Sequence, residues 1–322
     1  MPEHEHAEAS APETAATAAP ARAATLSPVQ LALGLQRTAG NAATAQLVQR
    51  FVNPSARTTV TEQDDSALTQ QRFTGSVFVR DAGENESGVD ADDITQGQLG
   101  DCYFLSPLAA AARINPSRIA HRIRGPVDTQ SDGTRVYDVD LFVPRLIGNP
   151  SKRTMRVTDR FVSASGGGSR YAQPGDVGAT GGEIWVMLIE KAWAGLRGGY
   201  DQAHSGLMSD GMTAVTGSDT DWEFVADNTD AEIFRDISSC VREGKPVVIQ
   251  TKQTFTPDEL AEMRDIEYNI SASHAYNIAG VNAAWQTIDI RNPHGINHLR
   301  DFPLVRLRHF FDAYVMSEDS FR

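Results

Sequence analysis

The chain has 322 residues, enough for one large domain or two of ordinary size with a substantial core. Hydrophobic residues make up 40% and charged residues 22%, a balance typical of globular proteins rather than of disordered or fibrous ones. The net charge of −13 argues against nucleic acid or an anionic membrane as a partner, because both attract basic surfaces.

No run of apolar residues approaches the ~18 that a membrane span needs. The first residues, MPEHEHAEAS, lack the basic and apolar regions of a Sec-type signal. Two cysteines, Cys102 and Cys240, make no disulfide framework and suit a reducing compartment. We therefore expect the protein to be cytoplasmic in the cell that makes it, and any export to use another route than Sec.

The N-terminal part has two kinds of sequence. Residues 1–25 are rich in Ala, Pro and Glu with almost no large apolar residue, so we expect a disordered tail. Residues 26–71 form the next unit. It begins at Ser27-Pro28 with a short, weakly amphipathic helical segment and continues as a polar linker.

Periodicity then predicts the elements of the main body in chain order. The acidic, glycine-containing stretch 81–93 predicts a solvated loop, with a calcium site as the alternative, although no EF-hand spacing is present. Residues 163–182 are glycine-rich and predict a second loop. The helix over 184–200 should end at Gly198-Gly199, and Cys240 falls on the apolar face of its helix. The predicted helices are 102–114, 184–200 and 230–245, and the predicted strands are 72–80, 134–144, 246–251, 275–283, 285–293, 302–311 and 313–316.

This order of elements predicts two lobes. Residues 72–215 should form a lobe of helices and loops, and residues 216–322 a lobe rich in β-strands. The fold class is therefore α+β.

Three residues in these lobes combine into a reactive pattern. Cys102 lies where a loop becomes a helix, and a thiolate is favoured at the positive end of the helix dipole. His274 opens one strand and Asn292 ends the next, 18 residues later. If these strands pair as antiparallel neighbours, both side chains reach the same sheet edge.

These residue types fit nucleophilic catalysis. A histidine within hydrogen-bond reach accepts the thiol proton and later protonates the leaving amine. An amide oxygen on the other ring nitrogen fixes the tautomer. Gln96, six residues before Cys102, could complete the site by donating its amide N–H to the oxyanion beside the Cys102 backbone N–H.

The same segments carry a family resemblance. QGQLGDCYFLSPLAA resembles the calpain nucleophile pattern Q-G-x-L-G-D-C-W-F-L, SHAYNIAG resembles G-H-A-Y-S-V-x-G, and RNPHG resembles R-N-P-W-G. IWVMLIEKAWAGLRGGYDQAHSG and TAVTGSDTDWEF are similar to two further calpain segments, in the family order, so the resemblance covers roughly residues 72–322. It implies a two-lobed papain-like core with Cys102 as nucleophile, His274 as base, Asn292 as orienting residue and Gln96 as oxyanion donor.

Three positions depart from the family pattern. Tyr103 stands for a tryptophan, Ser273 for a glycine and His294 for the tryptophan that shields the His–Asn pair from water. Calpain cores also bind calcium, but we match none of those ligands here. The chemistry itself requires no cofactor, so calcium dependence stays open. His294 and His298 are four residues apart, and metal ligation by them is an alternative to structural roles.

A shorter resemblance lies near the N-terminus. GLQRTAGNAATAQLVQR (34–50) is similar to a segment of bacterial proteins associated with contractile injection systems. It implies an effector or toxin that such a particle carries into a target cell. The sequence thus predicts a calpain-like cysteine endopeptidase with a protein substrate. The alternatives are an inactive pseudopeptidase or scaffold and a cysteine-dependent acyltransferase on the same fold.

Overall fold

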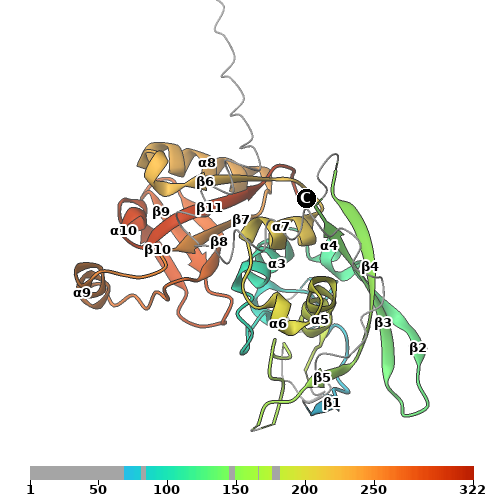
Figure 1. Cartoon of the computed structure of the whole chain (residues 1–322). Coiled ribbons are helices and arrows are strands. Elements are labelled where there is room, and N and C mark those ends of the chain that lie inside the picture. Colours follow the sequence, from blue (N-terminus) through green and yellow to red (C-terminus); the bar gives the residue numbers. More distant parts are fainter. Residues whose placement is uncertain (1–68, 81–84, 145–148, 166, 176–181) are drawn as a thin grey trace, which may run out of the picture.

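The structure is a computed structural model that describes residues 69–80, 85–144, 149–165, 167–175 and 182–322 (Figure 1). The predicted tail over 1–25 and the predicted helical segment that follows it lie outside these residues. Among the described helices, none is both long enough and apolar enough to cross a bilayer. The described part mixes helices and sheets, in agreement with the α+β class.

A six-stranded antiparallel sheet carries the C-terminal part of the chain. Its strand order is β10-β9-β8-β7-β11-β6, so that β8 and β9 are neighbours. The strands are β6 (Thr220–Phe224), β7 (Val247–Thr251), β8 (Ala275–Asn282), β9 (Thr287–Arg291), β10 (Leu299–Pro303) and β11 (Phe311–Ser317).

The two faces of this sheet pack into different hydrophobic clusters, because side chains alternate along a strand. On one face, Val248, Ala275 and Val315 join the cluster that contains α3 (Cys102–Ile114) and α7 (Met208–Thr216). On the other face, Ile249, Tyr276 and Tyr314 pack with α8 (Asp230–Glu243). The sheet is therefore covered by helices on both sides (Figure 1).

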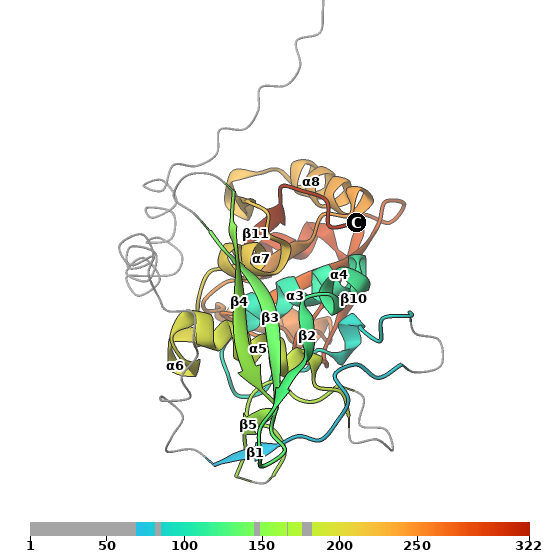
Figure 2. The same ribbon diagram turned by 90° about the vertical axis from the view of Figure 1, so that its right-hand side faces the viewer.

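A second sheet lies on the far side of the helices α3, α5 (Trp185–Arg197) and α7, and faces the viewer in Figure 2. It contains β2 (Ile123–Thr129), β3 (Arg135–Val143) and β4 (Ser151–Thr158) in that order. A small sheet pairs β1 (Gln70–Arg72) with β5 (Arg160–Val162). The short helices α4 (Pro116–Ala120) and α6 (Tyr200–Ala203) flank α3 and α5.

Several predicted elements are confirmed. The predicted helix 102–114 is α3, the helix 230–245 is α8 and the strand 134–144 is β3. Gly198 ends α5 in the left-handed conformation, at φ 100°, as the C-cap signal indicated. Cys240 is buried in the cluster under α8, as predicted. The boundary between the two predicted lobes, placed between residues 215 and 216, stays a prediction, because the six-stranded sheet contributes residues to both hydrophobic clusters.

Other predicted elements are wrong. The strand predicted over 302–311 is the end of β10 followed by the helical turns η3 (Leu304–Arg306) and α10 (Leu307–Phe310). Leu304, Leu307 and Phe310 are all buried, and this spacing is helical rather than alternating. The strand predicted over 72–80 is limited to β1 and one isolated bridge at Ser76.

The sequence reading also missed elements. Strand β2 was missed because it is almost wholly exposed and has no alternating pattern, and strand β4 because most of its residues are polar. The prediction from sequence also missed the helix α9 (Pro257–Asp265) and the short turns η1 (Ala91–Asp93) and η2 (Val225–Asp227).

Candidate active site

The nucleophile candidate, Cys102, is the first residue of α3 and is half-buried. The carbonyl of Asp101 accepts hydrogen bonds from the N–H groups of Phe104 and Leu105, which closes the first turn of the helix. Upstream, Gly97 has no room for a side chain, since a Cβ there would lie 1.9 Å from the Tyr171 carbonyl oxygen. Close packing of this loop therefore positions the start of α3.

The β8–β9 pair brings His274 and Asn292 together. His274 directly precedes β8, Asn292 directly follows β9, and Asn277 pairs with Arg291 in the antiparallel register. The Nε2 atom of His274 lies 3.0 Å from Oδ1 of Asn292. The predicted meeting of these two side chains at one sheet edge agrees with the structure.

The direction of that hydrogen bond follows from a second contact. The backbone N–H of His294 donates to Oδ1 of Asn292 over 3.0 Å, and a backbone N–H can only donate. The amide atom that faces His274 is therefore the oxygen, and Nε2 of His274 carries the hydrogen. In the neutral ring Nδ1 is then the acceptor, as a base toward a thiol requires.

Cys102 meets this sheet edge from the helix side. The backbone N–H of Ala275 donates to Sγ of Cys102 over 3.4 Å. One turn along α3, Oγ of Ser106 donates to the Ala275 carbonyl over 2.9 Å. These two contacts hold the start of α3 against the residue that follows His274.

The electrostatics favour a neutral pair. Burial raises the pKa of the Cys102 thiol to about 11, against the lowering effect of the Ala275 N–H. Burial also lowers the pKa of His274 to about 4, and the hydrogen bond to Asn292 only partly offsets this. Burial therefore opposes the thiolate that the start of α3 favours.

A buried carboxyl pair lies behind the nucleophile. Asp101 is fully buried, and Glu190 of α5 is 1% exposed. Two carboxyl groups buried side by side cannot both carry a charge without a large cost, so this pair favours a protonated form. Burial raises the pKa of both groups, that of Glu190 to about 7, although Glu190 also accepts the Ala172 N–H at 3.0 Å.

Gln96 lies close to the start of α3 and is buried. Its Nε2 donates one hydrogen to the Leu99 carbonyl over 2.7 Å, and its backbone N–H donates to the Pro293 carbonyl over 2.8 Å. An amide NH₂ has two hydrogens, so one remains for a further acceptor. This second hydrogen and the Cys102 backbone N–H, at the first position of a helix, are the two candidate oxyanion donors.

The two downstream histidines have separate positions. The ring of His294 stacks on that of His274, with centroids 5.0 Å apart and an angle of 10° between the planes. Nδ1 of His298 instead accepts the backbone N–H of Asn292 over 3.1 Å. His298 thus helps to hold Asn292.

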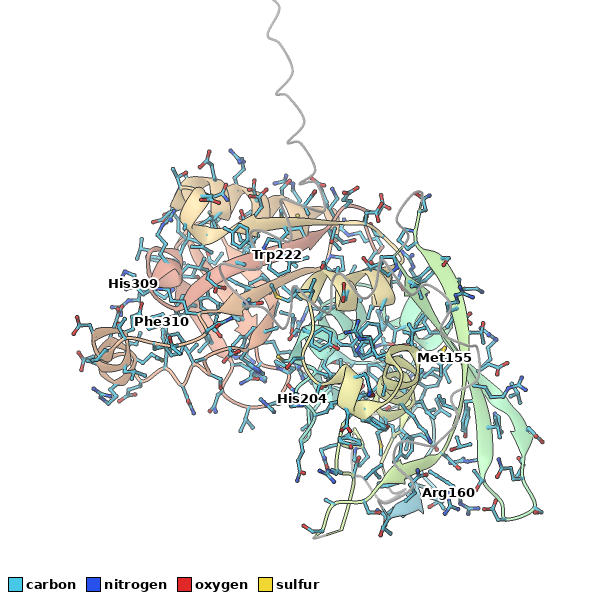
Figure 3. The ribbon with its side chains drawn as sticks, in the orientation of Figure 1. Met155, Arg160, His204, Trp222, His309 and Phe310 are labelled. Carbon is cyan, nitrogen blue, oxygen red and sulfur yellow. The ribbon has the colours of Figure 1, made fainter. Side chains whose placement is uncertain are left out.

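Sequence reasoning missed two positioning residues. The hydroxyl of Thr251, on β7, accepts a hydrogen bond from the backbone N–H of His274 over 3.0 Å and fixes the backbone at that residue. His204, which follows α6 (Figure 3), accepts the Gly100 N–H over 3.2 Å through Nδ1. No local sequence pattern marks either residue, because each binds a residue more than twenty positions away in the chain.

The described residues contain no group of three or more His, Cys, Asp or Glu side chains arranged to hold a metal ion. Two buried acidic side chains accept hydrogen bonds from other parts of the protein: Asp93 from the Trp185 indole N–H over 3.1 Å, and Glu183 from the Val79 backbone N–H over 3.0 Å. A calcium requirement is left to experiment.

A helix that begins with cysteine and packs against a histidine–asparagine pair is the arrangement of papain-like thiol proteases. The sequence profile of the family described as calpain family cysteine protease matches residues 76–302. The chain belongs to this family. The mixed helix-and-sheet architecture is consistent with a calpain and papain-like core.

Three relatives illustrate the similarity. Calpain-5 of Caenorhabditis elegans is 26% identical over 244 residues, which cover 71% of this chain and 36% of that protein. The calpain-type cysteine protease DEK1 of Zea mays is 30% identical over 129 residues, 40% of this chain and 5% of that protein. The calpain-1 catalytic subunit of Mus musculus is 24% identical over 219 residues, 65% of this chain and 28% of that protein. The chain therefore spans little more than a third of these relatives' length at most.

Proposed function

We propose that the protein is a cysteine endopeptidase in which Cys102 is the nucleophile, His274 the base and acid, Asn292 the orienting residue and Gln96 an oxyanion donor. The observation that carries this proposal is the joint position of three groups. The Ala275 N–H reaches the Cys102 sulfur at 3.4 Å, while His274 contacts Asn292 at 3.0 Å. The thiol thus lies beside the backbone of the residue that follows His274, and the imidazole of His274 contacts the amide of Asn292.

In the proposed reaction, Nδ1 of His274 takes the thiol proton as the Cys102 sulfur attacks the carbonyl carbon of the peptide. The oxyanion accepts the second Gln96 amide hydrogen and the Cys102 backbone N–H. The C–N bond then breaks, and His274 protonates the leaving amine. The thioester is hydrolysed when a water gives its proton to His274 and its oxygen attacks the acyl carbon, which returns the thiol.

Electrostatics add a condition to this scheme. Burial raises the pKa of the Cys102 thiol and lowers that of His274, which favours a neutral pair in which proton transfer accompanies attack. Substrate that excludes water and supplies the carbonyl would favour this concerted step. We therefore propose general-base catalysis from a resting thiol.

The test uses unfolded casein and purified full-length chain, with and without calcium and the thiol-reactive inhibitor E-64. We expect cleavage that E-64 blocks and that Cys102→Ala lowers on the order of 10⁴-fold or more. Cys240→Ala is the matched control, since Cys240 lies in the core under α8, and it should keep activity. The calcium arm measures metal dependence directly.

The other results separate the alternatives. No cleavage together with no E-64 adduct on Cys102 supports an inactive pseudopeptidase. An adduct without cleavage calls for an added amine, whose acylation in mass spectra would reveal an acyltransferase.

We also propose that residues 34–50 load the protein onto a contractile injection particle as an effector. The sequence resemblance supports this, and the segment lies outside the described residues. Residues 1–71 fused to a fluorescent protein should copurify with assembled particles. A fusion to residues 1–25 alone should not copurify.

A further inference from the structure

His294 is a second ionisable ring in the proposed site. It lies nearly parallel to His274, with 5.0 Å between the ring centroids. Its backbone N–H and Nε2 of His274 both bind the same Asn292 oxygen, so the two rings are held in one arrangement. His274 is buried, whereas His294 is half-buried and open to protons from solvent.

The groups around His294 leave His274 as the group that its charge affects most directly. From the loop before α3, the Gln96 carbonyl lies 3.4 Å from Nδ1 of His294 and carries no net charge. From α3, the Cys102 thiol is neutral at pH 7 because burial raises its pKa. Behind Asn292, Arg291 forms an ion pair with Asp92 at 3.0 Å, and His298 contacts the Asn292 N–H. Within the described residues, no carboxylate forms an ion pair with His294.

Charge on His294 matters because His274 must become an imidazolium during the proposed reaction. Two stacked rings cannot both be positive at this separation without strong repulsion in a partly desolvated site. Imidazole groups in proteins change charge at about pH 6–7. A proton on the outer ring therefore opposes the proton that the inner ring must receive from Cys102.

We propose that His294 is a pH-dependent positioning residue that switches the endopeptidase off on acidification. Its neutral ring stacks on His274 and supports turnover, and its protonated ring prevents the imidazolium from forming. This inference rests on the proposed peptidase function and adds regulation to that same site. With this switch, the enzyme is active at neutral pH and its activity is suppressed in an acidic compartment.

The test compares His294→Phe with the full-length wild type. Phenylalanine keeps a flat ring over His274 but cannot be charged. The logarithm of kcat/KM for a peptide substrate is measured from pH 4.5 to 8.5. His309→Asn is the matched control, since His309 contacts Glu262 at 2.7 Å and lies apart from His204, the residue that binds the Gly100 N–H (Figure 3).

We expect wild type and His309→Asn to lose kcat/KM as the pH falls, with a limiting slope of about tenfold per pH unit, the slope of one titrating group. Relative to its own value at pH 7.5, the kcat/KM of His294→Phe should begin to fall at least about one pH unit lower than that of wild type. Coincident acid limbs in wild type and His294→Phe would overturn the proposal.

A second measurement does not depend on activity. In the Cys102→Ala background, NMR follows the ring ¹³Cε1 shift of His274 through a pH titration. We expect the pKa of His274, which burial and the neighbouring His294 lower to about 4, to rise when His294 becomes phenylalanine. An unchanged His274 titration contradicts this inference, whereas loss of cleavage at every pH with the His274 shift intact contradicts the proposed function alone.

Discussion

The two halves of the candidate site are built in different ways. The His274–Asn292 half is local, since two neighbouring antiparallel strands bring together residues 18 positions apart. The Cys102 half depends on distant segments. Burial and the neighbouring Glu190 of α5 raise the pKa of Asp101, and His204 binds the Gly100 N–H across 104 positions. The histidine half is thus readable from strand register, and the reactivity of the cysteine half depends on tertiary packing.

Among the predictions that compare the two halves, the largest expected effect concerns the thiol itself. Because burial raises the pKa of Cys102 to about 11, the rate of its alkylation by iodoacetamide should rise about tenfold per pH unit, or about a thousandfold between pH 7 and 10. Peptide mass spectrometry measures the rate separately for Cys102 and Cys240. A rate at Cys102 that is already maximal at pH 7 would mean that Cys102 is a thiolate in the resting enzyme, paired with a protonated His274.

The carboxyl pair behind Cys102 gives a prediction about stability. The carboxyl of Glu190 titrates at about 7 in the folded protein, because burial raises its pKa from 4.5. Between these pH values the folded state holds more protons than the unfolded state. The contribution of Glu190 to stability is therefore fully present below pH 4.5 and is lost as the pH rises through 7. The loss is on the order of 3 kcal/mol.

Glu190→Gln should remove most of this pH dependence. Urea midpoints at pH 5 and pH 8 measure it, and we expect the wild type to lose more stability than the variant over this interval. The exposed control Asp258→Asn, on α9, should behave as wild type. Equal losses in wild type and Glu190→Gln would show that the pair shares no proton.

The histidine half is tested by Asn292. Asn292→Ala removes the acceptor that selects the reactive tautomer of His274, so we expect kcat to fall about 100-fold with KM within about threefold. Asn292→Asp keeps an oxygen for both N–H donors and should recover part of the loss. If alanine and aspartate variants lose the same activity, then orientation by this hydrogen bond is not the role of Asn292.

Much of this site could be predicted from the sequence, for physical reasons. The positions of Cys102, His274 and Asn292 follow from one helix start and one strand pair, and both are short-range signals. The fold was harder where polarity hid strands, as in β4, where only Met155 and Val157 are buried. The ionisation states could not be predicted, because they depend on burial by residues far apart in the chain. The expected thiolate is the clearest example, since helix position favours it and burial opposes it.

The smallest expected effect lies at Ser273, at the junction of the two halves. Its φ of 51° is in the left-handed region, where a side chain costs about 1 kcal/mol and glycine costs little. Ser273 is exposed, so Ser273→Gly removes strain without opening a cavity. We expect a gain of about 0.5–1 kcal/mol in the free energy of unfolding, with kcat/KM unchanged.

The matched control for this last prediction is Ala272→Gly, one residue earlier and also exposed, with no positive φ. Glycine there should destabilise the protein by about 0.5–1 kcal/mol, because it only adds freedom to the unfolded chain. Opposite signs at adjacent positions would assign the effect to the backbone conformation before His274. The same sign at both would mean that the left-handed turn carries no strain.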